Sequence, residues 1–335
     1  MWFNSHFLEE LQEMNEDATI YDCIVNKDSF KEHIQDFIDF KITKENYKIL
    51  IDLCEFLMID NVDVFIDRII EIHDYDYSII YDFEDFYKYN TKRLIPLDIR
   101  TLSIAIIIYC KDHKECFHSY GFSSFWDVSK IEHMDYMFYK SQFNGDISNW
   151  DVSNVKMMRN MFYCSQFNGD ISNWNVSNVE NMDCMFMYSH FNKDISNWNV
   201  SNVKYMGSMF CESKFNGDIS KWDVANVKVM CFMFSKSVFN KDISNWNVSN
   251  VYNMDGLFEE SKFNEDISKW DVSNVKCMDT MFKYSNFNKD ISNWNVSNVE
   301  NMYNMFKNSQ FNGDISKWNL SKLEHKKSDI LKWDL

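Results

Sequence analysis

The chain has 335 residues, a formal net charge of −17 and a mean hydropathy of −0.42. Residues 1–125 carry 12 basic and 25 acidic side chains, whereas residues 126–335 carry 22 and 26. Because an acidic protein is repelled by phosphate backbones, nucleic acid is excluded as a partner. The uneven charge and the length together predict two parts, a front domain over residues 1–125 and a second part over residues 126–335.

The first 22 residues, MWFNSHFLEELQEMNEDATIYD, have neither a basic start nor an apolar core. A secretory signal needs both, so the sequence predicts no signal peptide. Nine cysteines occur along the chain, an odd number with irregular spacing. This usage favours a reducing compartment over a disulfide framework, and we expect an intracellular, cytoplasmic protein.

Residues 37–70 carry two apolar stripes at helical spacing, separated by a short break at residues 59–61. The stripes are Tyr47, Leu50, Cys54 and Leu57, then Val62, Phe65, Ile66 and Ile69. Each stripe covers one face of a helix, so this region predicts a pair of helices. We therefore expect the front domain to be mainly α-helical.

Lys41, Ile42 and Asn46 lie before this helix pair at the spacing of a G-x-I-x-x-x-N segment. With that segment, residues 37–70 resemble the C-terminal half of a BTB/POZ domain. The resemblance implies docking onto a protein, with a cullin-type scaffold of ubiquitin ligases as the partner class. Only 36 residues precede Phe37, so the part that builds the dimer in a complete BTB domain is short or missing. Helical hairpins of other families give the same stripes, and that alternative stays open.

An apolar run, LDIRTLSIAIIIYC, spans residues 97–110 directly after Pro96, the only proline. The run is too short to cross a bilayer, so the sequence predicts no membrane span. We expect it to lie as a buried helix or strand over the first coil of the repeats that follow, because an open solenoid end exposes its core. The next segment, DHKECFH, offers His113, Cys116 and His118 to zinc, but no second ligand pair follows at zinc-finger spacing, so a plain loop is expected.

Tryptophans then mark a repeat of 24 residues without a single slip. They are Trp126, Trp150, Trp174, Trp198, Trp222, Trp246, Trp270, Trp294 and Trp318. A fixed period of this size indicates a solenoid, whose coils bury their apolar faces against their neighbours, so we expect these tryptophans to form the structural core. Eight units run over residues 126–317, and a partial unit with a C-terminal cap takes residues 318–335.

Each unit, or coil, is numbered from its tryptophan as position 1. Positions 1 and 3, such as Trp150 and Val152, share one face of a predicted short strand. Positions 9, 12 and 13, such as Met158, Met161 and Phe162, have the spacing of one inward-facing helical turn. The predicted fold class is an α/β repeat solenoid, leucine-rich-repeat-like, with one parallel strand and one helical turn in each coil.

The units fit the pattern W-[DN]-V-S-N-V-x-x-M-x-x-M-F-x-x-S-x-F-N-x-D-I-S. This pattern resembles the BspA-like leucine-rich repeats of bacterial and protist surface proteins, over residues 126 to about 320. The resemblance implies a curved parallel solenoid used for binding or adhesion, although surface members need an export signal that residues 1–22 do not provide. BTB-like fronts joined to repeats, with heavy use of Asn, Lys, Ile and Asp, look like the multigene families of large DNA viruses, which implies a host-cell setting.

The invariant polar positions favour a structural role. Position 21 is Asp in all eight units, with Asn at position 19 and Ser at positions 16 and 23, and such side chains bond the backbone of corners. Calcium-binding β-rolls supply several glycines per short turn, whereas Lys193, Lys241 and Lys289 stand beside these carboxylates. The serines have no accompanying base, and no glycine-rich phosphate loop occurs. The sequence therefore predicts no enzyme, no metal and no cofactor.

Two surfaces compete as binding sites. Positions 7, 8, 10, 11, 14 and 15 differ between units and carry the candidate partner-binding residues Tyr139, Tyr163, Tyr188, Tyr205, Tyr252, Tyr284 and Tyr303. Tyrosine is a favoured hot-spot residue, so we predict a scaffold for protein–protein interaction, although the same residues also fit tolerant exposed sites. The alternative is a structural or adhesive surface rod, whose flat lattice of Asx at position 2 and Ser or Ala at position 4 suits a repetitive ligand such as polysaccharide.

Overall fold

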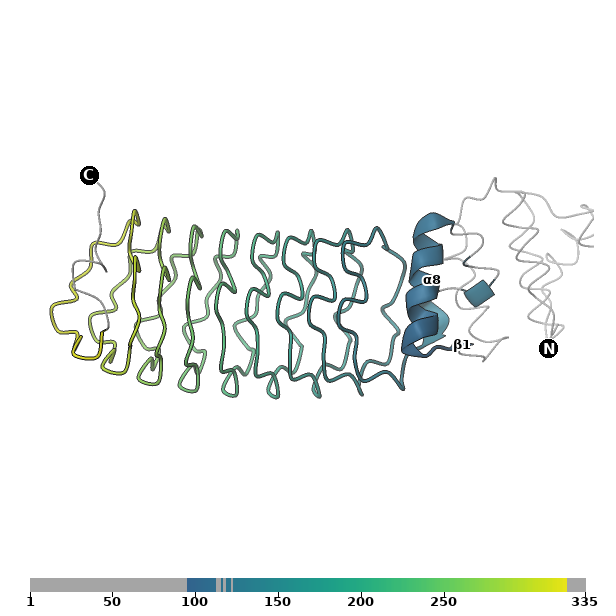
Figure 1. Ribbon diagram of the computed structural model, residues 1–335, viewed down its shortest axis with the longest axis horizontal. Helices are drawn as coiled ribbons and strands as arrows, with labels where there is room; N and C mark the ends of the chain where they lie inside the picture. Colours follow the sequence, from purple (N-terminus) through teal and green to yellow (C-terminus); the bar gives the residue numbers. More distant parts are fainter. Residues whose placement is uncertain (1–94, 113–115, 117–118, 122, 324–335) are drawn as a thin grey trace, which may run out of the picture. The chain divides into compact units, whose positions relative to one another are not determined.

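The computed structural model describes residues 95–112, 116, 119–121 and 123–323. These residues belong to the second of two units into which the chain divides, 1–94 and 95–335. The BTB-like segment 37–70 and the end of the C-terminal cap, residues 324–335, lie outside the described residues. Figure 1 shows the coils of the second unit stacked one after another along a single axis, with one helix across the end of the first coil.

That end of the array is closed by a short strand and a helix. Strand β1 (Ile95–Pro96) pairs in parallel with strand β2 (Trp126–Asp127), and helix α8 (Ile99–Lys111) and the 3-10 helix η2 (Ser123–Phe125) lie between them in sequence. Asp98 caps α8 by accepting a 2.7 Å hydrogen bond from the amide of Thr101. The buried face of α8 is made of Leu102, Ala105 and Ile106, which belong to the same apolar core as the coils. The apolar run 97–110 thus forms a helix, and its buried face continues the solenoid core.

Three aromatic columns fill the core of the array. Trp198 and Trp222 at position 1 stack with ring centroids 6.5 Å apart and planes only 4° apart. Phenylalanines at position 13 form a second column, in which Phe210 and Phe234 lie 5.9 Å apart. A third column at position 18 contacts the second within each coil, as Phe215 does at 4.3 Å from Phe210. These offset stacks bind each coil to its neighbours, because every ring contacts rings of adjacent coils.

The indole N–H of each tryptophan from Trp150 onward donates to a backbone carbonyl 27 residues earlier in the chain. The Nε1 atom of Trp174 donates to the carbonyl of Ile147 at 2.9 Å, and Trp222 donates to Ile195 at 3.1 Å. The same bond occurs at every position-1 tryptophan from Trp174 to Trp318. The nine tryptophans of the repeat are at most 6 % exposed and lie in the apolar core of the array. A buried indole N–H needs such a partner, so register between coils is fixed at this point.

The predicted helical turn at positions 9–13 is wrong. Alternate amides donate to the next coil instead of four residues back: Met158 to Asn181 at 3.0 Å, Asn160 to Asp183 at 2.9 Å and Phe162 to Met185 at 2.9 Å. Positions 11 and 15 of every coil have φ values between 52° and 61°, which a right-handed helix does not allow. The segment is a series of tight turns, and its apolar spacing of three and four residues coincides with that of a helix.

The predicted strand at positions 1–3 is also wrong for coils 2 to 8. Only Trp126 and Asp127 of coil 1 form a strand there, paired with β1. Elsewhere in the described array, parallel pairing between coils is a bridge one residue long at position 8, as between Met157 and Asn181. The side chain at position 2 makes the same local turn in both settings, since Asp127 and Asp151 each accept a hydrogen bond from the amide two residues later at 3.0 Å, so the pairing with β1 is what distinguishes coil 1.

Gly256 offers a sharp test of the turn geometry. It occupies position 11 of coil 6 with φ +58°, and a Cβ atom added there overlaps the ring of Phe232 in the coil before. We expect Gly256→Ala to lower the free energy of unfolding by about 1–3 kcal/mol, through the displaced ring and the backbone conformation. Urea denaturation measures this change. In the Phe232→Ala background, Gly256→Ala should lower the free energy of unfolding by a smaller amount. An equal decrease in both backgrounds would show that the added Cβ atom does not clash with the Phe232 ring.

Candidate partner-binding face

Most of the repeated polar side chains bond the solenoid's own backbone. The Oδ1 atom of Asp218 at position 21 accepts from the amide of Ser220 at 2.9 Å, and the Oγ atom of Ser213 at position 16 accepts from Phe215 at 3.1 Å. Position 19 forms a ladder in which Asn192 accepts from the amide of Asn216 at 2.9 Å. The same bonds recur along the array, which confirms the predicted corner role of these side chains.

The corner carboxylates make the stability of the array depend on pH. The amide of the serine two residues later holds the pKa of six of them below the ordinary value of 3.8: Asp170, Asp194, Asp218, Asp242, Asp266 and Asp290. A lowered folded-state pKa stabilises the fold above the unfolded pKa, and this stabilisation is lost as the pH falls through the folded-state value. Burial acts in the opposite sense on Asp183 and Asp255, whose raised pKa values favour the folded state at low pH.

With six lowered pKa values against two raised ones, we expect the melting temperature to fall when the pH drops from about 5 to about 3. The substitution Asp218→Asn keeps the side-chain acceptor oxygen and removes the charge, so it should reduce the dependence on acid. Asp218→Ala removes the acceptor at every pH and should lower stability throughout. A melting temperature that is flat or rises between these pH values would contradict this account.

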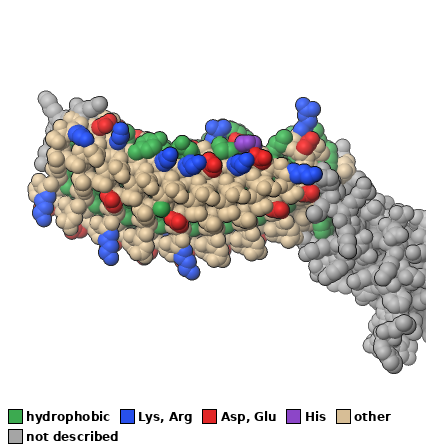
Figure 2. All heavy atoms as spheres, turned by 90° about the horizontal axis from the view of Figure 1, so that it is seen from below, with side chains coloured by type: hydrophobic (Ala, Val, Ile, Leu, Met, Phe, Trp, Pro, Cys, Tyr) green, Lys and Arg blue, Asp and Glu red, His purple; other side chains and the backbone are tan. Residues whose placement is uncertain are grey.

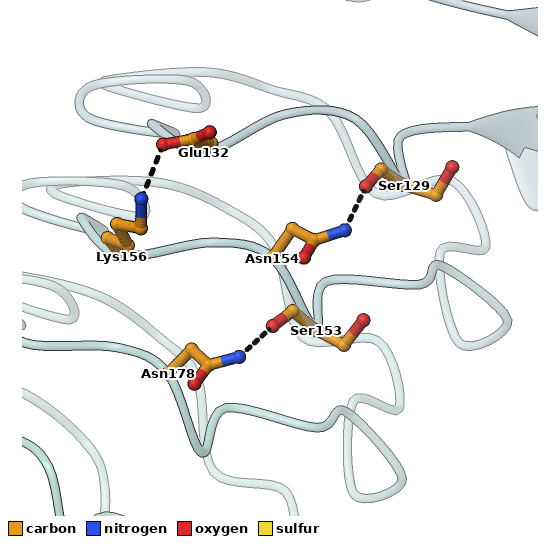
Figure 3. A network of polar contacts seen from close by, with 6 residues as sticks. All are labelled: Ser129, Glu132, Ser153, Asn154, Lys156 and Asn178. Carbon is orange, nitrogen blue, oxygen red and sulfur yellow. Dashed lines mark hydrogen bonds and ion pairs between the residues drawn. The ribbon is translucent and has the colours of Figure 1, made fainter.

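A polar groove of about 350 Å³ runs along positions 5 and 7 of coils 1 to 4. At position 5 the amide nitrogen of Asn154 donates to the carbonyl of Ser129 at 2.7 Å, and the bond recurs in each later coil (Figure 3). At position 7, Lys156 pairs with Glu132 at 2.7 Å. Glu180 and Lys204 make the same pair at 2.6 Å in coils 3 and 4. The groove is thus lined by charges that neutralise each other.

Positions 7, 8, 10, 11, 14 and 15 together form what we call the variable face. Figure 2 shows hydrophobic and charged side chains gathered along one long edge of the array, beside a wall that carries few of either. Of the seven predicted tyrosines, five are at least 39 % exposed and two are half-buried. The exposed five are Tyr139, Tyr188, Tyr252, Tyr284 and Tyr303, and the half-buried two are Tyr163 and Tyr205.

Three of the predicted tyrosines come together with a fourth that the sequence analysis missed. Tyr136 and Tyr139 meet edge to face at 5.7 Å, Tyr139 stacks on Tyr163 at 4.9 Å, and Tyr163 meets Tyr188 edge to face at 5.5 Å. We call these four residues the tyrosine row. It spans coils 1 to 3. The signal for Tyr136 was present, because it occupies position 11 of coil 1, three residues before Tyr139.

The remaining predicted tyrosines, Tyr205, Tyr252, Tyr284 and Tyr303, lie outside the row, in coils 4 to 8. Tyr284 has the Lys283 ammonium 5.4 Å from its ring centre, and that ammonium pairs with Glu259 at 2.9 Å. In the row, Lys140 lies 5.2 Å from the ring centre of Tyr139 and Arg159 lies 5.7 Å from that of Tyr136. The two ends of the array therefore present their tyrosines in different electrostatic settings.

The described residues give little scope for metal or thiol chemistry. They contain no group of three or more His, Cys, Asp or Glu side chains placed to hold a metal ion. All seven cysteines in the described part of the chain are free thiols. Burial raises the pKa of Cys211 and of Cys231 to about 11, so both stay protonated and unreactive at neutral pH. None of the helices in this part is long and apolar enough to cross a membrane.

Comparison with known proteins supports the repeat architecture. A model of one protein family, described as Mycoplasma protein of unknown function, DUF285, matches residues 113–213, 186–262 and 236–332. Searches of curated proteins and of solved structures find no match. The three tandem matches confirm the resemblance of the array to BspA-like repeats, whereas nothing in them supports the BTB-like segment. Because the matches together span well over half of the chain, the protein belongs to the DUF285 family of repeat proteins.

Proposed function

We propose that the chain is a non-enzymatic scaffold that holds a protein partner on its variable face, with the tyrosine row at the centre of the contact. The row supports this proposal because four tyrosines lie in contact with one another on exposed turns, whereas the polar lattice is bonded to the backbone. Tyrosine is enriched among the residues that contribute most to protein–protein binding.

Rigidity of the supporting turns adds to this argument. The amides of Tyr136 and Lys140 donate to the carbonyls of Arg159 and Tyr163 in the next coil, both at 2.8–2.9 Å. The tyrosine backbones are thus fixed on both sides before a partner arrives. Little conformational entropy is then lost on binding, which favours affinity.

The proposal includes a docking role for the front of the chain. The resemblance of residues 37–70 to a BTB/POZ domain supports an intracellular adaptor that joins a cullin-type scaffold to whatever the array binds. Co-purification of cullin-type ligase components from the native cell tests it, with the full chain compared against a chain that lacks residues 1–94. Recovery of these components with both chains, or with neither, would contradict the adaptor role of the front of the chain. The proposed scaffold role of the array would still stand.

The binding role of the row is tested with a matched pair of tyrosines. Tyr188 and Tyr284 both occupy position 15, with φ values of 58° and 56°, and both are exposed, but only Tyr188 belongs to the row. Proteins cross-linked to the full chain in its native cell are identified by mass spectrometry. A partner should be lost with Tyr188→Ala and kept with Tyr284→Ala. Equal capture by both variants would remove the row from the interaction.

A second candidate function is a structural or adhesive rod that binds a repetitive ligand such as polysaccharide. The polar groove along positions 5 and 7 favours it, because the asparagine column repeats once per coil. Affinity electrophoresis in gels that contain linear polysaccharides tests this function. Retardation that disappears with Asn178→Ala, in a variant that remains folded, would favour the rod over the scaffold.

A further inference from the structure

We infer that the tyrosine row takes an acidic segment of its partner, an extended stretch rich in Asp and Glu. This inference rests on the proposed function and specifies the chemistry of the partner. Three features of coils 1 to 3 carry it: Tyr136, Tyr139 and Tyr163 each have a ring face covered, the cations beside the rings make no ion pair with a carboxylate of the described residues, and the Tyr163 phenol remains a hydrogen-bond donor.

Three rings of the row, those of Tyr136, Tyr139 and Tyr163, have a face covered by groups of the protein itself. Tyr139 and Tyr163 stack with planes 17° apart, so each covers a face of the other. Arg159 lies over the ring of Tyr136, and Lys140 lies over that of Tyr139. A base or a sugar ring needs an open aromatic face on which to stack. At these three rings the row therefore offers a partner mainly ring edges, and the edge of an aromatic ring carries the positive part of its quadrupole, which attracts anions.

Cations in the row differ from those along the rest of the array. Five lysines on the variable face pair with a glutamate of an adjacent coil at 4.0 Å or less: Lys156, Lys204, Lys236, Lys276 and Lys283. Lys140 and Arg159 have no such pair among the described residues and lie over tyrosine rings. Their charges are therefore available to carboxylates of a partner, at the place where the row presents its edges.

Two carboxylates next to the row are engaged with the solenoid's backbone, and a third, Glu212 beside Tyr188, pairs with Lys236 at 3.6 Å. Asp135 accepts from the amide of Arg159 at 2.8 Å, and Asp183 accepts from the amide of Gly207 at 2.7 Å. Burial raises the pKa of Asp183, and the nearby positive charge of Arg159 acts on it in the opposite direction. Burial also raises the pKa of the Tyr163 phenol, so it keeps its proton at neutral pH and can donate to a carboxylate, whereas the Tyr188 phenol already bonds the carboxylate of Glu212.

The size of the row fits a short linear segment. Neighbouring coils of a parallel solenoid lie about 4.8 Å apart, so three coils present a row on the order of 10 Å long. An extended chain rises about 3.3 Å per residue and covers that length with three or four residues. Residues at the coil 1 end of such a segment then lie beside Lys140 and Arg159, which sit over Tyr139 and Tyr136. A segment of this kind needs no fold of its own, since the rigid row supplies the template.

The test uses the full chain and a displayed library of random peptides, each about twelve residues long, which leaves room at both ends of the row. Clones are kept if they bind the native chain and not the Tyr139→Ala, Tyr163→Ala double variant. The binding of synthetic peptides from these clones is then measured by fluorescence anisotropy. We expect enrichment in Asp and Glu, and affinity that falls at least about tenfold when the salt concentration rises from about 0.1 to about 0.5 M.

Matched variants separate local from general charge effects. Lys140 and Lys283 both lie over a tyrosine ring, at 5.2 Å from Tyr139 and 5.4 Å from Tyr284, but Lys283 pairs with Glu259 at 2.9 Å and lies outside the row. Lys140→Gln should weaken the binding of the peptides several-fold, while Lys283→Gln, with the same change in net charge, should leave their binding unchanged. Clones that depend on the row but are neutral or basic would overturn this inference and leave the proposed scaffold standing. No clone that depends on the row would overturn both.

Discussion

The substitution Trp222→Ala is expected to lower the free energy of unfolding by about 3–5 kcal/mol, the cost of replacing a buried aromatic side chain by alanine. Trp222 is 3 % exposed and packs against Trp198 and Phe210 of the preceding coil. The substitution also removes the indole N–H that bonds the carbonyl of Ile195 at 3.1 Å, and leaves that buried acceptor without its partner. The damage should spread, because these contacts cross from one coil to the next.

Amide hydrogen exchange measures this spread. In Trp222→Ala we expect lost protection in the coils on both sides of residue 222, since a solenoid is stabilised mainly by contacts between neighbours. Trp318 supplies the control, because the last complete unit ends at residue 317 and a full coil lies on one side of it only. Trp318→Ala should lower the free energy of unfolding less than Trp222→Ala does, and it should reduce protection in fewer coils. Loss of protection confined to the coil of Trp222 would contradict a shared core.

The sequence was sufficient to predict the solenoid and its core because these follow from period alone. A tryptophan every 24 residues, with apolar partners at fixed offsets, leaves stacking as the only way to bury Trp222 and its equivalents. The corner bonds were predictable for a similar reason, since Asx and Ser side chains beside an irregular backbone bond local amides. Asp218 with Ser220 and Ser213 with Phe215 are examples.

The local backbone was not predictable from the same pattern. Met158, Met161 and Phe162 point inward in a helical turn and equally in a series of tight turns, so their spacing does not distinguish the two. The two structures differ in the hydrogen-bond acceptors of the backbone amides. Here the amide of Asn160 donates to the carbonyl of Asp183 in the next coil, which excludes a helical turn. Left-handed φ values at Asn160 and Cys164 are tolerated because these intercoil bonds hold them, and neither residue is the glycine that normally signals such a conformation.

The tyrosine row was predictable only in part. Position alone identified Tyr139, Tyr163 and Tyr188 as variable and exposed, but the contact between positions 14 and 15 of different coils depends on the stagger between coils. Tyr136 joins the row because the turn brings position 11 beside position 14. The pairing state of Lys140 depends on side chains in three coils. Such relations follow from the geometry of the turns, which the repeat pattern does not specify.

We expect that deletion of one whole coil lowers the stability of the array less than removal of one indole within that coil. When residues 222–245 are deleted, Trp246 takes the place of Trp222: it can stack on Trp198 and donate to the carbonyl of Ile195, because every intercoil contact repeats with the period of the deletion. Stability then falls only by one coil and one coil–coil contact of a nearly additive series. We expect the deleted chain to unfold in a single cooperative transition and to melt at a higher temperature than Trp222→Ala.

A deletion of half a coil, residues 222–233, is the matched control for that result. It places position 13 of one coil directly after the end of another, so the aromatic columns at positions 1, 13 and 18 no longer align beyond the junction. Circular dichroism and calorimetry should show that this shorter deletion destabilises the array more than the longer one does. The ordering has one physical cause, the continuity of the columns from coil to coil. If the loss of stability instead followed the number of residues removed, the coils would not be equivalent units, and the tyrosine row could not be assigned to coils 1 to 3 as a separable surface.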